Sequence, residues 1–313
     1  KSLTGVSTGE IQANEKEMLL HLEDTLHTKV MGQHEAVKIV ASTMRRSRTG
    51  LVSAAKPIGS FLFLGPTGVG KTETAKALAQ VFFGSEEHMS RIDMNEYTMS
   101  NSSYRLLGGS DQEGDITKLI HERPYGVLLL DEFEKATTDV KDLFLRVLDE
   151  GVFTNGAGKL ISARTQIIIA TSNAGSQYIQ ESGLNAGSTK EEIEVIKNQL
   201  LKRIVSEGLF RPELINRFDG VVIFHPLGED SKILIAKKML EALRERALTQ
   251  GYAVTFTDSL VEKLISHERN GVFGGRAIQR SIQSEVEEIL ARKIIEGNVS
   301  VGGSLTLDAQ DIE

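Results

Sequence analysis

The sequence predicts an α/β protein in which a large first domain, built on a parallel sheet flanked by helices, precedes a smaller, mostly helical α/β domain. Short apolar runs such as Phe61–Leu64 and Val127–Leu130 are typical of strands buried on both faces of a parallel sheet. Later in the chain, apolar stripes at helical spacing take over. We therefore expect a large domain over residues 1–226, beginning with a polar lead-in over 1–14, and a small domain over 227–313.

The composition restricts the classes of function. The 313 residues contain no cysteine, which excludes disulfides, a catalytic thiol and cysteine-ligated zinc and is typical of a reducing, cytoplasmic setting. The net charge of −7 gives no support to nucleic-acid binding. No apolar run approaches the roughly 20 residues of a membrane span, so we expect no membrane contact. Because the chain has neither an initiator methionine nor a signal-peptide pattern, we interpret it as part of a longer protein.

The first domain is predicted to alternate helices and strands. Apolar residues at three- and four-residue spacing predict helices over residues 15–28, 34–48, around 75–82, 138–148 and 190–207. Short apolar runs predict strands over residues 61–64, 89–93, 127–132, 166–171 and 221–224, the third of which ends in two acids. A hairpin is expected around Asn155-Gly156-Ala157-Gly158, and polar segments over 94–103 and 175–188 are expected to be loops.

The second domain is predicted to consist of three helices and two short strands. The helices are expected over residues 229–250, 258–269 and 275–296, and the strands over 253–256 and 304–307. In the last helix, apolar residues repeat at helical spacing, which we interpret as a core stripe rather than as an interaction motif.

A phosphate-binding loop follows the first buried strand, with the sequence Gly65-Pro66-Thr67-Gly68-Val69-Gly70-Lys71-Thr72. Glycines let the backbone curl so that several N–H groups face one anion. In this pattern Lys71 reaches the β- and γ-phosphates of a nucleotide and the hydroxyl of Thr72 is a ligand of Mg²⁺. Since a strand precedes the motif and a helix follows it, we expect ATP and Mg²⁺ as cofactors.

Polar residues at the ends of two further strands extend this site. Asp131 closes an apolar strand, where a carboxylate meets Mg²⁺, and Glu132 beside it is the candidate to polarise an attacking water molecule. Asn173 follows the strand over 166–171. Taken singly, paired acids also occur as exposed strand ends, and asparagine after a strand is usually a turn residue.

The arginines are weak signals by themselves. Arg211, Arg217 and Arg276 are as compatible with exposed surface charges as with a role at a phosphate. The basic end of the helix over 34–48 is equally compatible with a helix C-terminus stabilised by cations and with a contact to a nucleotide or a neighbour.

Together these segments resemble the second ATPase module of Clp-type AAA+ unfoldases, most closely the ClpB-like disaggregases and next the ClpA and ClpC protease partners. The resemblance covers nearly the whole chain. It rests on the phosphate loop and on the motifs Arg91-Ile-Asp-Met-Asn-Glu-Tyr97, Pro124-Tyr125, Leu128-Leu-Leu-Asp-Glu-Phe-Glu-Lys135, Thr171-Ser-Asn173, Phe210-Arg-Pro-Glu213, Ile215-Asn-Arg-Phe-Asp219, Phe224-His-Pro-Leu227 and Gly274-Gly-Arg276.

The resemblance implies further roles for individual residues. Gly32 and Gln33 would border the adenine pocket, and Asn173 would be the sensor that helps to hold the attacking water. Arg217 matches an arginine finger that reaches the γ-phosphate of a neighbouring subunit, and Arg276 matches the sensor arginine of the small domain. A finger acting on a neighbour implies a homo-oligomeric ring, in this family a hexamer.

The implied function is ATP hydrolysis that drives protein unfolding or disaggregation. Unfolded or aggregated proteins would then be substrates, and a co-chaperone would be a further partner. Two alternatives remain: the unfolding subunit of a Clp protease, which docks on a peptidase ring, and a nucleotide-gated assembly scaffold without translocation. Ser182-Gly183-Leu184 lies about where protease partners carry an Ile-Gly-Leu-like docking tripeptide, but it lacks the first apolar residue.

One departure from the family pattern concerns substrate threading. Relatives carry a Gly-aromatic-Val-Gly pore loop, whereas here Leu106-Leu107-Gly108 runs directly into Gly109-Ser110-Asp111-Gln112-Glu113-Gly114. Either the protein lacks the tip of this loop, or the sequence omits a mobile tip. The first interpretation favours the scaffold and the second favours threading.

Overall fold

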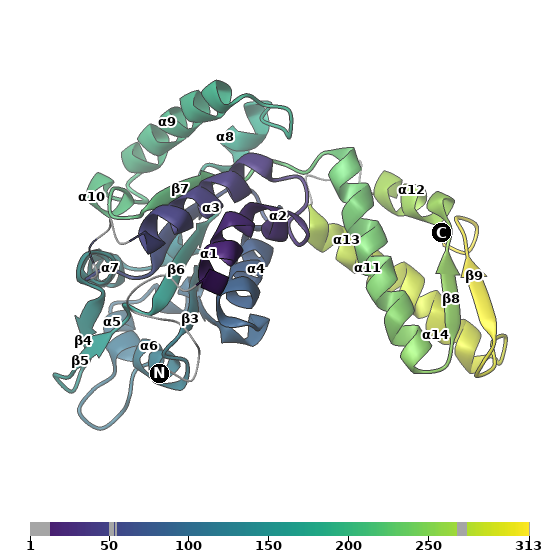
Figure 1. Ribbon diagram of the computed structural model, residues 1–313, viewed down its shortest axis with the longest axis horizontal. Coiled ribbons are helices and arrows are strands. Elements are labelled where there is room, and N and C mark those ends of the chain that lie inside the picture. Colours follow the sequence, from purple (N-terminus) through teal and green to yellow (C-terminus); the bar gives the residue numbers. More distant parts are fainter. Residues whose placement is uncertain (1–12, 50–52, 54, 268–273, 313) are drawn as a thin grey trace. The chain divides into compact units, whose positions relative to one another are not determined.

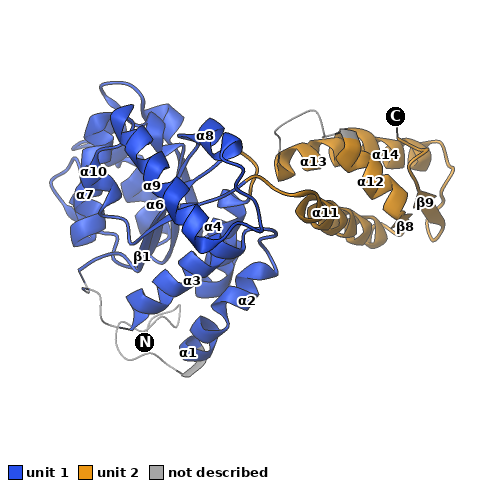
Figure 2. Cartoon of the chain, turned by 90° about the horizontal axis from the view of Figure 1, so that it is seen from above, with its two compact units in different colours: residues 1–66, 70–225 blue, residues 67–69, 226–313 orange. Residues whose placement is uncertain are grey.

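The computed structural model describes residues 13–49, 53, 55–267 and 274–312 (Figure 1). The chain forms two compact units, which Figure 2 shows in different colours. The first unit holds residues 1–66 and 70–225, and the second holds 67–69 and 226–313. Of the lead-in expected over residues 1–14, residues 1–12 lie outside the described part, and helix α1 begins at Ala13.

A five-stranded parallel sheet forms the centre of the first unit, which confirms the predicted fold class. The strands lie in the order β2-β3-β6-β1-β7 and comprise β1 (Gly59–Leu64), β2 (Met89–Asp93), β3 (Gly126–Asp131), β6 (Gln166–Ser172) and β7 (Gly220–Ile223). Every residue of β1, β3 and β6 is buried, as expected for central strands that are covered on both faces. Because neighbouring strands are parallel, their carboxyl ends share one edge of the sheet.

Helices flank this sheet (Figure 1). They are α1 (Ala13–Leu20), α2 (Leu22–His27), α3 (His34–Arg48), α4 (Lys71–Phe83), α5 (Ser102–Leu107), α6 (Asp115–Glu122), α7 (Thr138–Glu150), α8 (Ser176–Glu181), α9 (Lys190–Ser206) and α10 (Pro212–Ile215). The predicted hairpin is present as β4 (Val152–Thr154) and β5 (Leu160–Ser162), which pair antiparallel. Short 3₁₀ turns include η2 (Met94–Tyr97) and η3 (Phe133–Lys135).

The sequence predictions were incomplete where helices are short. The single helix expected over residues 15–28 is two helices that meet at His21. Helices α5, α6, α8 and α10 were not predicted; α5 begins in the polar segment that ends at residue 103, and all of α8 lies in the predicted loop over 175–188. These helices have 6, 8, 6 and 4 residues, so each spans too few turns for an apolar period to be recognised.

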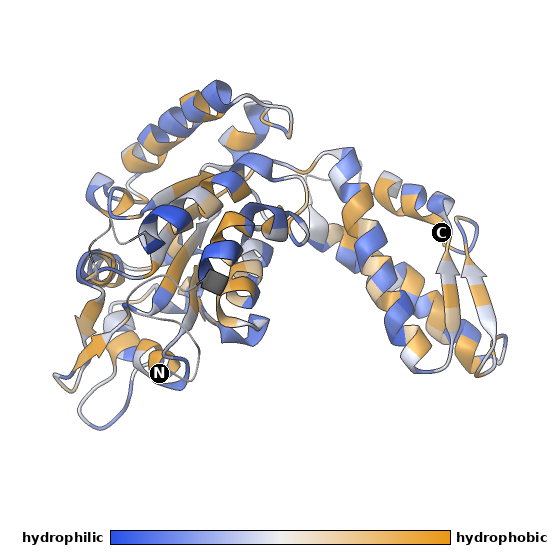
Figure 3. Cartoon of the chain, in the orientation of Figure 1, coloured by the Kyte–Doolittle hydropathy of each residue, from blue (hydrophilic) through white to orange (hydrophobic). Residues whose placement is uncertain are grey.

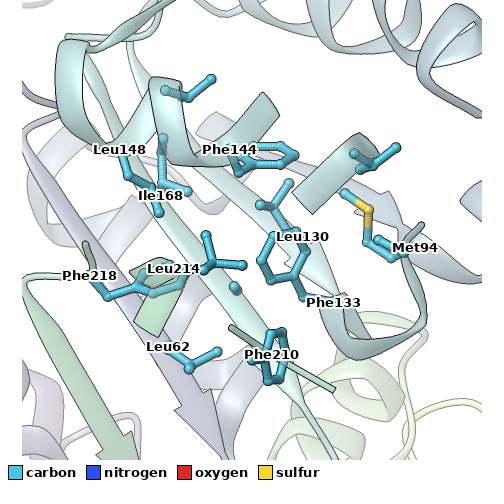
Figure 4. Close-up of a cluster of buried hydrophobic side chains, with 14 of the residues drawn as sticks. Leu62, Met94, Leu130, Phe133, Phe144, Leu148, Ile168, Phe210, Leu214 and Phe218 are labelled. Atoms are coloured by element: carbon cyan, nitrogen blue, oxygen red, sulfur yellow. The ribbon is translucent and has the colours of Figure 1, made fainter. Parts of the chain in front are cut away.

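An aromatic cluster anchors the segment that follows β3 (Figure 4). The rings of Phe133 and Phe144 meet edge to face with centroids 5.4 Å apart, and Phe210 lies 5.9 Å and Phe218 6.5 Å from Phe133. The Phe133 and Phe144 side chains are fully buried. This packing fixes the backbone immediately after the paired acids Asp131 and Glu132.

The second unit packs its helices beside a two-stranded parallel sheet. Its elements are α11 (Glu229–Thr249), α12 (Asp258–His267), α13 (Gly275–Ser281), α14 (Glu288–Ile295), β8 (Ala253–Phe256) and β9 (Ser304–Leu307). A π-helical segment, Ile282–Glu287, joins α13 to α14, so the helix predicted over residues 275–296 is continuous but has wider i→i+5 hydrogen bonding in its middle. The last two residues of the helix predicted over 258–269 lie outside the described residues.

The hydropathy of the chain agrees with this architecture. Figure 3 shows apolar residues along the central strands and an alternation of polar and apolar residues along α11. The apolar stripe predicted in the last helix forms the core of the second unit with Ile278, Ile282, Val286 and Leu290. Within the described residues, no helix combines the length and the apolar character that a membrane span requires.

Replacing Phe144 by alanine should lower the free energy of unfolding by about 3–5 kcal/mol, because the change leaves a cavity beside Phe133 in a close-packed core. Urea denaturation followed by circular dichroism measures this change. Val195→Ala, at a side chain that is 56% exposed on α9, is the control and should shift stability by less than about 0.5 kcal/mol. Equal effects of the two substitutions would contradict the assignment of this cluster as the core.

Candidate functional site

The phosphate loop begins where β1 ends, and its backbone requires glycine at two positions in the first unit. A Cβ atom on Gly65 would lie 2.5 Å from the carbonyl oxygen of Phe224, so no other side chain fits there without a shift. Gly70 has φ +111° and is the residue from which α4 starts. The left-handed region is open to glycine at little cost. The local sequence therefore directs the chain from β1 into the N-terminus of α4.

Lys71 is buried and connects this loop to the end of β6. Its ammonium group donates hydrogen bonds to the carbonyl oxygens of Gly65 and Pro66, the latter at 2.9 Å, and to Oδ1 of Asn173 at 2.8 Å. The structure thus brings Lys71 and Asn173 together, although 102 residues separate them in the chain. A phosphate oxygen would be a stronger acceptor for this ammonium group than a neutral carbonyl oxygen.

Asp131 ends β3 with both carboxylate oxygens engaged. The hydroxyl of Thr171, on the neighbouring strand β6, donates to Oδ1, and the guanidinium group of Arg91, on β2, donates to Oδ2 at 2.6 Å. The Asp131 side chain is only 11% exposed, so these two donors compensate the cost of burying its charge. Sequence reasoning did not assign a role to Thr171 or Arg91.

The predicted magnesium ligands have suitable chemistry. Mg²⁺ prefers hard oxygen donors, and Thr72 and Asp131 offer a hydroxyl and a carboxylate. Among the residues that the structure describes, no group of three or more His, Cys, Asp or Glu side chains could hold a metal ion alone. A site with one carboxylate suits Mg²⁺ that is also bound by nucleotide phosphates.

Glu132 adopts a strained backbone conformation. Its φ of 55° and ψ of 47° place it in the left-handed region, and no other non-glycine residue in the described ranges has a positive φ. Such a conformation costs on the order of 1–2 kcal/mol and persists only where the surroundings enforce it. The Glu132 N–H donates to the Thr171 hydroxyl at 3.3 Å, and the buried Phe133 follows directly. Strain of this kind often marks a functional residue.

The carboxylate of Glu132 has a polar partner that sequence reasoning missed. Nδ2 of Asn95, in η2, donates to Glu132 at 3.0 Å and also to Asp93 at 2.8 Å. Asn95 belongs to the motif over residues 91–97, but its exposed side chain was given no role, and the sequence does not show this contact. In this arrangement the amide group of Asn95 orients the Glu132 carboxylate.

Asn173 is held from both sides. Its backbone N–H donates to Oε1 of Glu134 at 3.1 Å, while its side chain accepts from Lys71. The backbone carbonyl of Glu134 in turn accepts a hydrogen bond from Lys141 at 2.8 Å. Burial lowers the pKa of Lys141, partly offset by the charge of Glu134. Glu134 is thus a supporting residue that was predicted only as part of a motif.

The two residues expected at an adenine pocket lie between α2 and α3. Gly32 has φ +70°, and the Gln33 side chain is fully buried. Nε2 of Gln33 donates to the carbonyl oxygen of His225 at 2.8 Å, and the N–H of His225 donates to Oε1 of Gln33 at 3.3 Å. Gln33 therefore binds the backbone at the end of the first unit.

The candidate arginines lie in different places. Arg217 forms an ion pair with Asp149 and Arg211 forms one with Asp142 at 2.9 Å, both acids being on α7. Arg276 is the second residue of α13 in the second unit. The prediction that these arginines act on phosphates remains a prediction.

The segment expected to carry a pore loop is a tight turn. The N–H of Gly109 donates to the carbonyl oxygen of Gln112 at 2.8 Å, and Gly108 and Glu113 form an isolated antiparallel bridge. The residues of the turn, Gly109-Ser110-Asp111-Gln112, include no aromatic side chain. The N–H of Gly156, in the β4–β5 loop, donates to Leu107 at 3.1 Å and holds the base of this turn.

Comparisons with known proteins agree with the resemblance. Residues 56–221 match the family described as AAA domain (Cdc48 subfamily), and residues 227–307 match the C-terminal, D2-small domain of ClpB protein. The chain is 42% identical to the chaperone protein ClpB of Vibrio cholerae over 98% of its own length and 36% of that protein. It is 38% identical to the ATP-dependent Clp protease ATP-binding subunit ClpC of Staphylococcus epidermidis, over 97% of its own length and 38% of that protein.

A third relative is the negative regulator of genetic competence ClpC/MecB of Bacillus subtilis, which is 39% identical over 100% of this chain and 39% of its own length. The chain thus spans a little more than a third of the curated relatives that it matches. Similarity to both chaperones and protease subunits covers nearly the whole chain.

Replacing Gln33 by alanine should lower the free energy of unfolding by about 1–3 kcal/mol, because it removes two buried hydrogen bonds to the backbone of His225. Chemical denaturation of the purified chain measures the change. Gln177→Ala removes an exposed glutamine that bonds only to a neighbouring side chain on α8, Glu181, and should change stability by less than about 0.5 kcal/mol. If both variants were as stable as the parent, the contact with His225 would not contribute to the free energy of unfolding.

Proposed function

The chain belongs to the AAA domain family and carries a C-terminal domain of the ClpB small-domain type. From this premise we propose that it binds and hydrolyses ATP. The hydrolysis drives protein unfolding or disaggregation by a ring-forming chaperone of which this chain is one module. The observation that carries the proposal is the convergence of Lys71, Asp131 and Asn173 at one edge of the parallel sheet. These groups can bind phosphate, hold a divalent cation and orient water, which are the parts that phosphoryl transfer requires.

In this proposal the residues of the loop bind the nucleotide. The backbone from Gly65 to Gly70 cradles the phosphates, Lys71 exchanges its carbonyl partners for phosphate oxygens, and the N-terminus of α4 faces the anion. Thr72 and Asp131 would hold Mg²⁺, which neutralises charge on the β- and γ-phosphates when it is bound. Gly32 and Gln33 border the adenine.

Glu132 acts on the water molecule. Its carboxylate accepts the proton of the attacking water, and the strained backbone with the Asn95 contact fixes where that carboxylate points. Asn173, held by Glu134, helps to position the same water. Arg217 acts on the γ-phosphate of a neighbouring subunit in a hexamer, and Arg276 of the small domain reports on the phosphates of its own subunit.

Two observations bear on the alternative functions. Leu184, which ends the segment that corresponds to a peptidase-docking tripeptide, is only 5% exposed and packs in the hydrophobic core. A buried leucine is unavailable for docking, which favours a chaperone over a protease subunit.

The turn over 109–112 offers no aromatic side chain to a polypeptide, which favours a nucleotide-gated scaffold as the second candidate. Unfolding of a fluorescent substrate protein separates the chaperone from the scaffold, and binding to a peptidase ring tests the protease subunit.

Substrates, co-chaperones and location follow from the same proposal. The relatives of this chain are named chaperone protein ClpB and Clp protease ATP-binding subunit. We propose that the substrates of this chain are unfolded or aggregated proteins. We place the protein in the cytoplasm, where a chain without cysteine needs no oxidising compartment. The large ATPase domain over 1–226 and the lid over 227–313 are the proposed functional division.

Glu132→Gln should retain ATP binding and lose hydrolysis by about 10²-fold or more, since the amide cannot accept the proton of the water. Lys71→Ala should instead weaken nucleotide binding itself. Phosphate release and binding of a fluorescent ATP analogue measure the two effects separately. Glu194→Gln, on the exposed face of α9, is a control that should match the parent. Parental turnover by Glu132→Gln would assign water activation to another residue.

ATPase activity per subunit should rise with protein concentration, because Arg217 is proposed to act in trans and arginine fingers contribute about 10³–10⁵ in rate. Mixtures of Arg217→Ala and Lys71→Ala subunits should recover part of the activity, since each variant supplies what the other lacks. Lys71→Ala mixed with Glu132→Gln is the negative control, because neither has a competent site. If assembled mixed rings showed no recovery at any ratio, Arg217 would not be the finger.

A further inference from the structure

Arg91 covers one of the two carboxylate oxygens of Asp131, the proposed metal ligand. Arg91 lies on β2, the strand that pairs with β3. In the register of these strands Asp93 lies opposite Asp131, so Arg91, two residues before Asp93, reaches Asp131 diagonally. Diagonal neighbours on adjacent strands lie within reach of long side chains. The contact from the guanidinium group to Oδ2 measures 2.6 Å, which is typical of a charge-assisted hydrogen bond.

The two ends of this ion pair differ in burial. The Arg91 side chain is 49% exposed, whereas that of Asp131 is 11% exposed. A buried carboxylate without a partner is costly, so Arg91 compensates the charge of Asp131 when no other cation is present. Because its own end lies near solvent, the guanidinium group can leave the carboxylate and remain hydrated.

The other oxygen of Asp131 is fixed by a neutral donor. Thr171 donates to Oδ1 from within β6, where the side chain is buried and the strand is central. A divalent cation at Asp131 therefore meets a carboxylate with one oxygen oriented by Thr171 and the other covered by Arg91. A cation that binds Oδ2 has to displace the guanidinium group, since two positive groups at one oxygen repel each other.

We propose that Arg91 is a removable counter-ion of Asp131, which holds the carboxylate in the metal-free protein and opposes the binding of Mg²⁺ with the nucleotide. The inference rests on the proposed function, because it requires Asp131 to be a metal ligand. Arg91 then sets how strongly nucleotide affinity depends on Mg²⁺. It is a positioning residue that acts through Asp131.

The test compares ADP binding with and without metal. Isothermal titration calorimetry gives the affinity of the parent and of Arg91→Gln for ADP in EDTA and in saturating Mg²⁺. Arg91→Gln should bind ADP in EDTA within about twofold of the parent, because without metal ADP binding does not displace the guanidinium group of the parent from Asp131. In Mg²⁺ it should bind ADP roughly tenfold more tightly, the change expected when one charge-assisted hydrogen bond no longer has to be displaced.

Two further variants complete the experiment. Arg203→Gln removes a guanidinium group on α9 that is also 49% exposed and is paired with Glu207, just after that helix, so it makes the same charge change away from the site and should leave both affinities unchanged. Arg91→Lys keeps the positive charge but lacks the planar guanidinium group, so in Mg²⁺ it should bind ADP more tightly than the parent, by less than Arg91→Gln does. Thermal unfolding adds an independent measure: Arg91→Gln should be less stable than the parent without metal and should gain more stability from Mg²⁺ with ADP.

The outcomes distinguish the inference from the proposed function. If the parent bound no ADP, the proposed function would fail and the inference with it. If the parent bound ADP and Arg91→Gln showed unchanged or weaker affinity in Mg²⁺, Arg91 would not oppose the metal and the inference alone would be overturned. A loss of affinity confined to EDTA would show a direct contact with phosphate and would likewise overturn it. If Arg91→Gln does not fold, Arg91→Lys carries the test. The inference is then retained only if Arg91→Lys binds ADP in Mg²⁺ more tightly than both the parent and Arg203→Gln.

Discussion

The hydroxyl group of Thr171 is the contact on which the arrangement of the candidate site depends. This one group donates to the carboxylate of Asp131 and accepts the N–H of Glu132, so it fixes both acids at the end of β3. Thr171 is placed by the sheet, because β6 pairs with β3 on one side and with β1, opposite Phe63, on the other. A shift of one residue in either register would turn this side chain to the opposite face. The parallel register therefore positions the acids and the phosphate loop together.

The strain at Glu132 is possible because packing holds the residues on either side of it. Upstream, Asp131 is tied to β2 and β6. Downstream, Phe133 lies fully buried among other aromatic rings, and the edge-to-face contact with Phe144 leaves it little freedom. The left-handed conformation between them costs on the order of 1–2 kcal/mol, which one buried aromatic side chain readily offsets. The hydrophobic core and the candidate catalytic residue are thus parts of one arrangement.

The sequence was sufficient for features that rest on long or chemically specific patterns. It predicted the central strands and α3 at its observed bounds. It also singled out Lys71 and Asn173, which the structure brings together, while the roles given to Lys71, Asp131, Glu132 and Asn173 remain predictions. It could not predict the partners that these residues have. Arg91 lies on the edge strand β2 and Asn95 in the turn that follows it, and only the folded structure shows that they reach Asp131 and Glu132. Short helices such as α8 were missed because their period is too brief to recognise.

Three of the charged groups proposed to act on ATP already have a partner inside the chain. Lys71 binds Asn173, Asp131 binds Arg91, and Arg217 binds Asp149. These contacts keep buried or half-buried charges compensated and their side chains ordered without a nucleotide. Binding of a nucleotide then exchanges one set of ionic partners for another, and the net gain is the difference between the two sets. A site built in this way stays organised when empty, while its affinity for phosphate and metal remains lower than the same charges would give if they were unpaired. Under the proposed function, this exchange would give the chain two sets of contacts, one without and one with nucleotide, which is the physical basis that a nucleotide-driven conformational cycle requires.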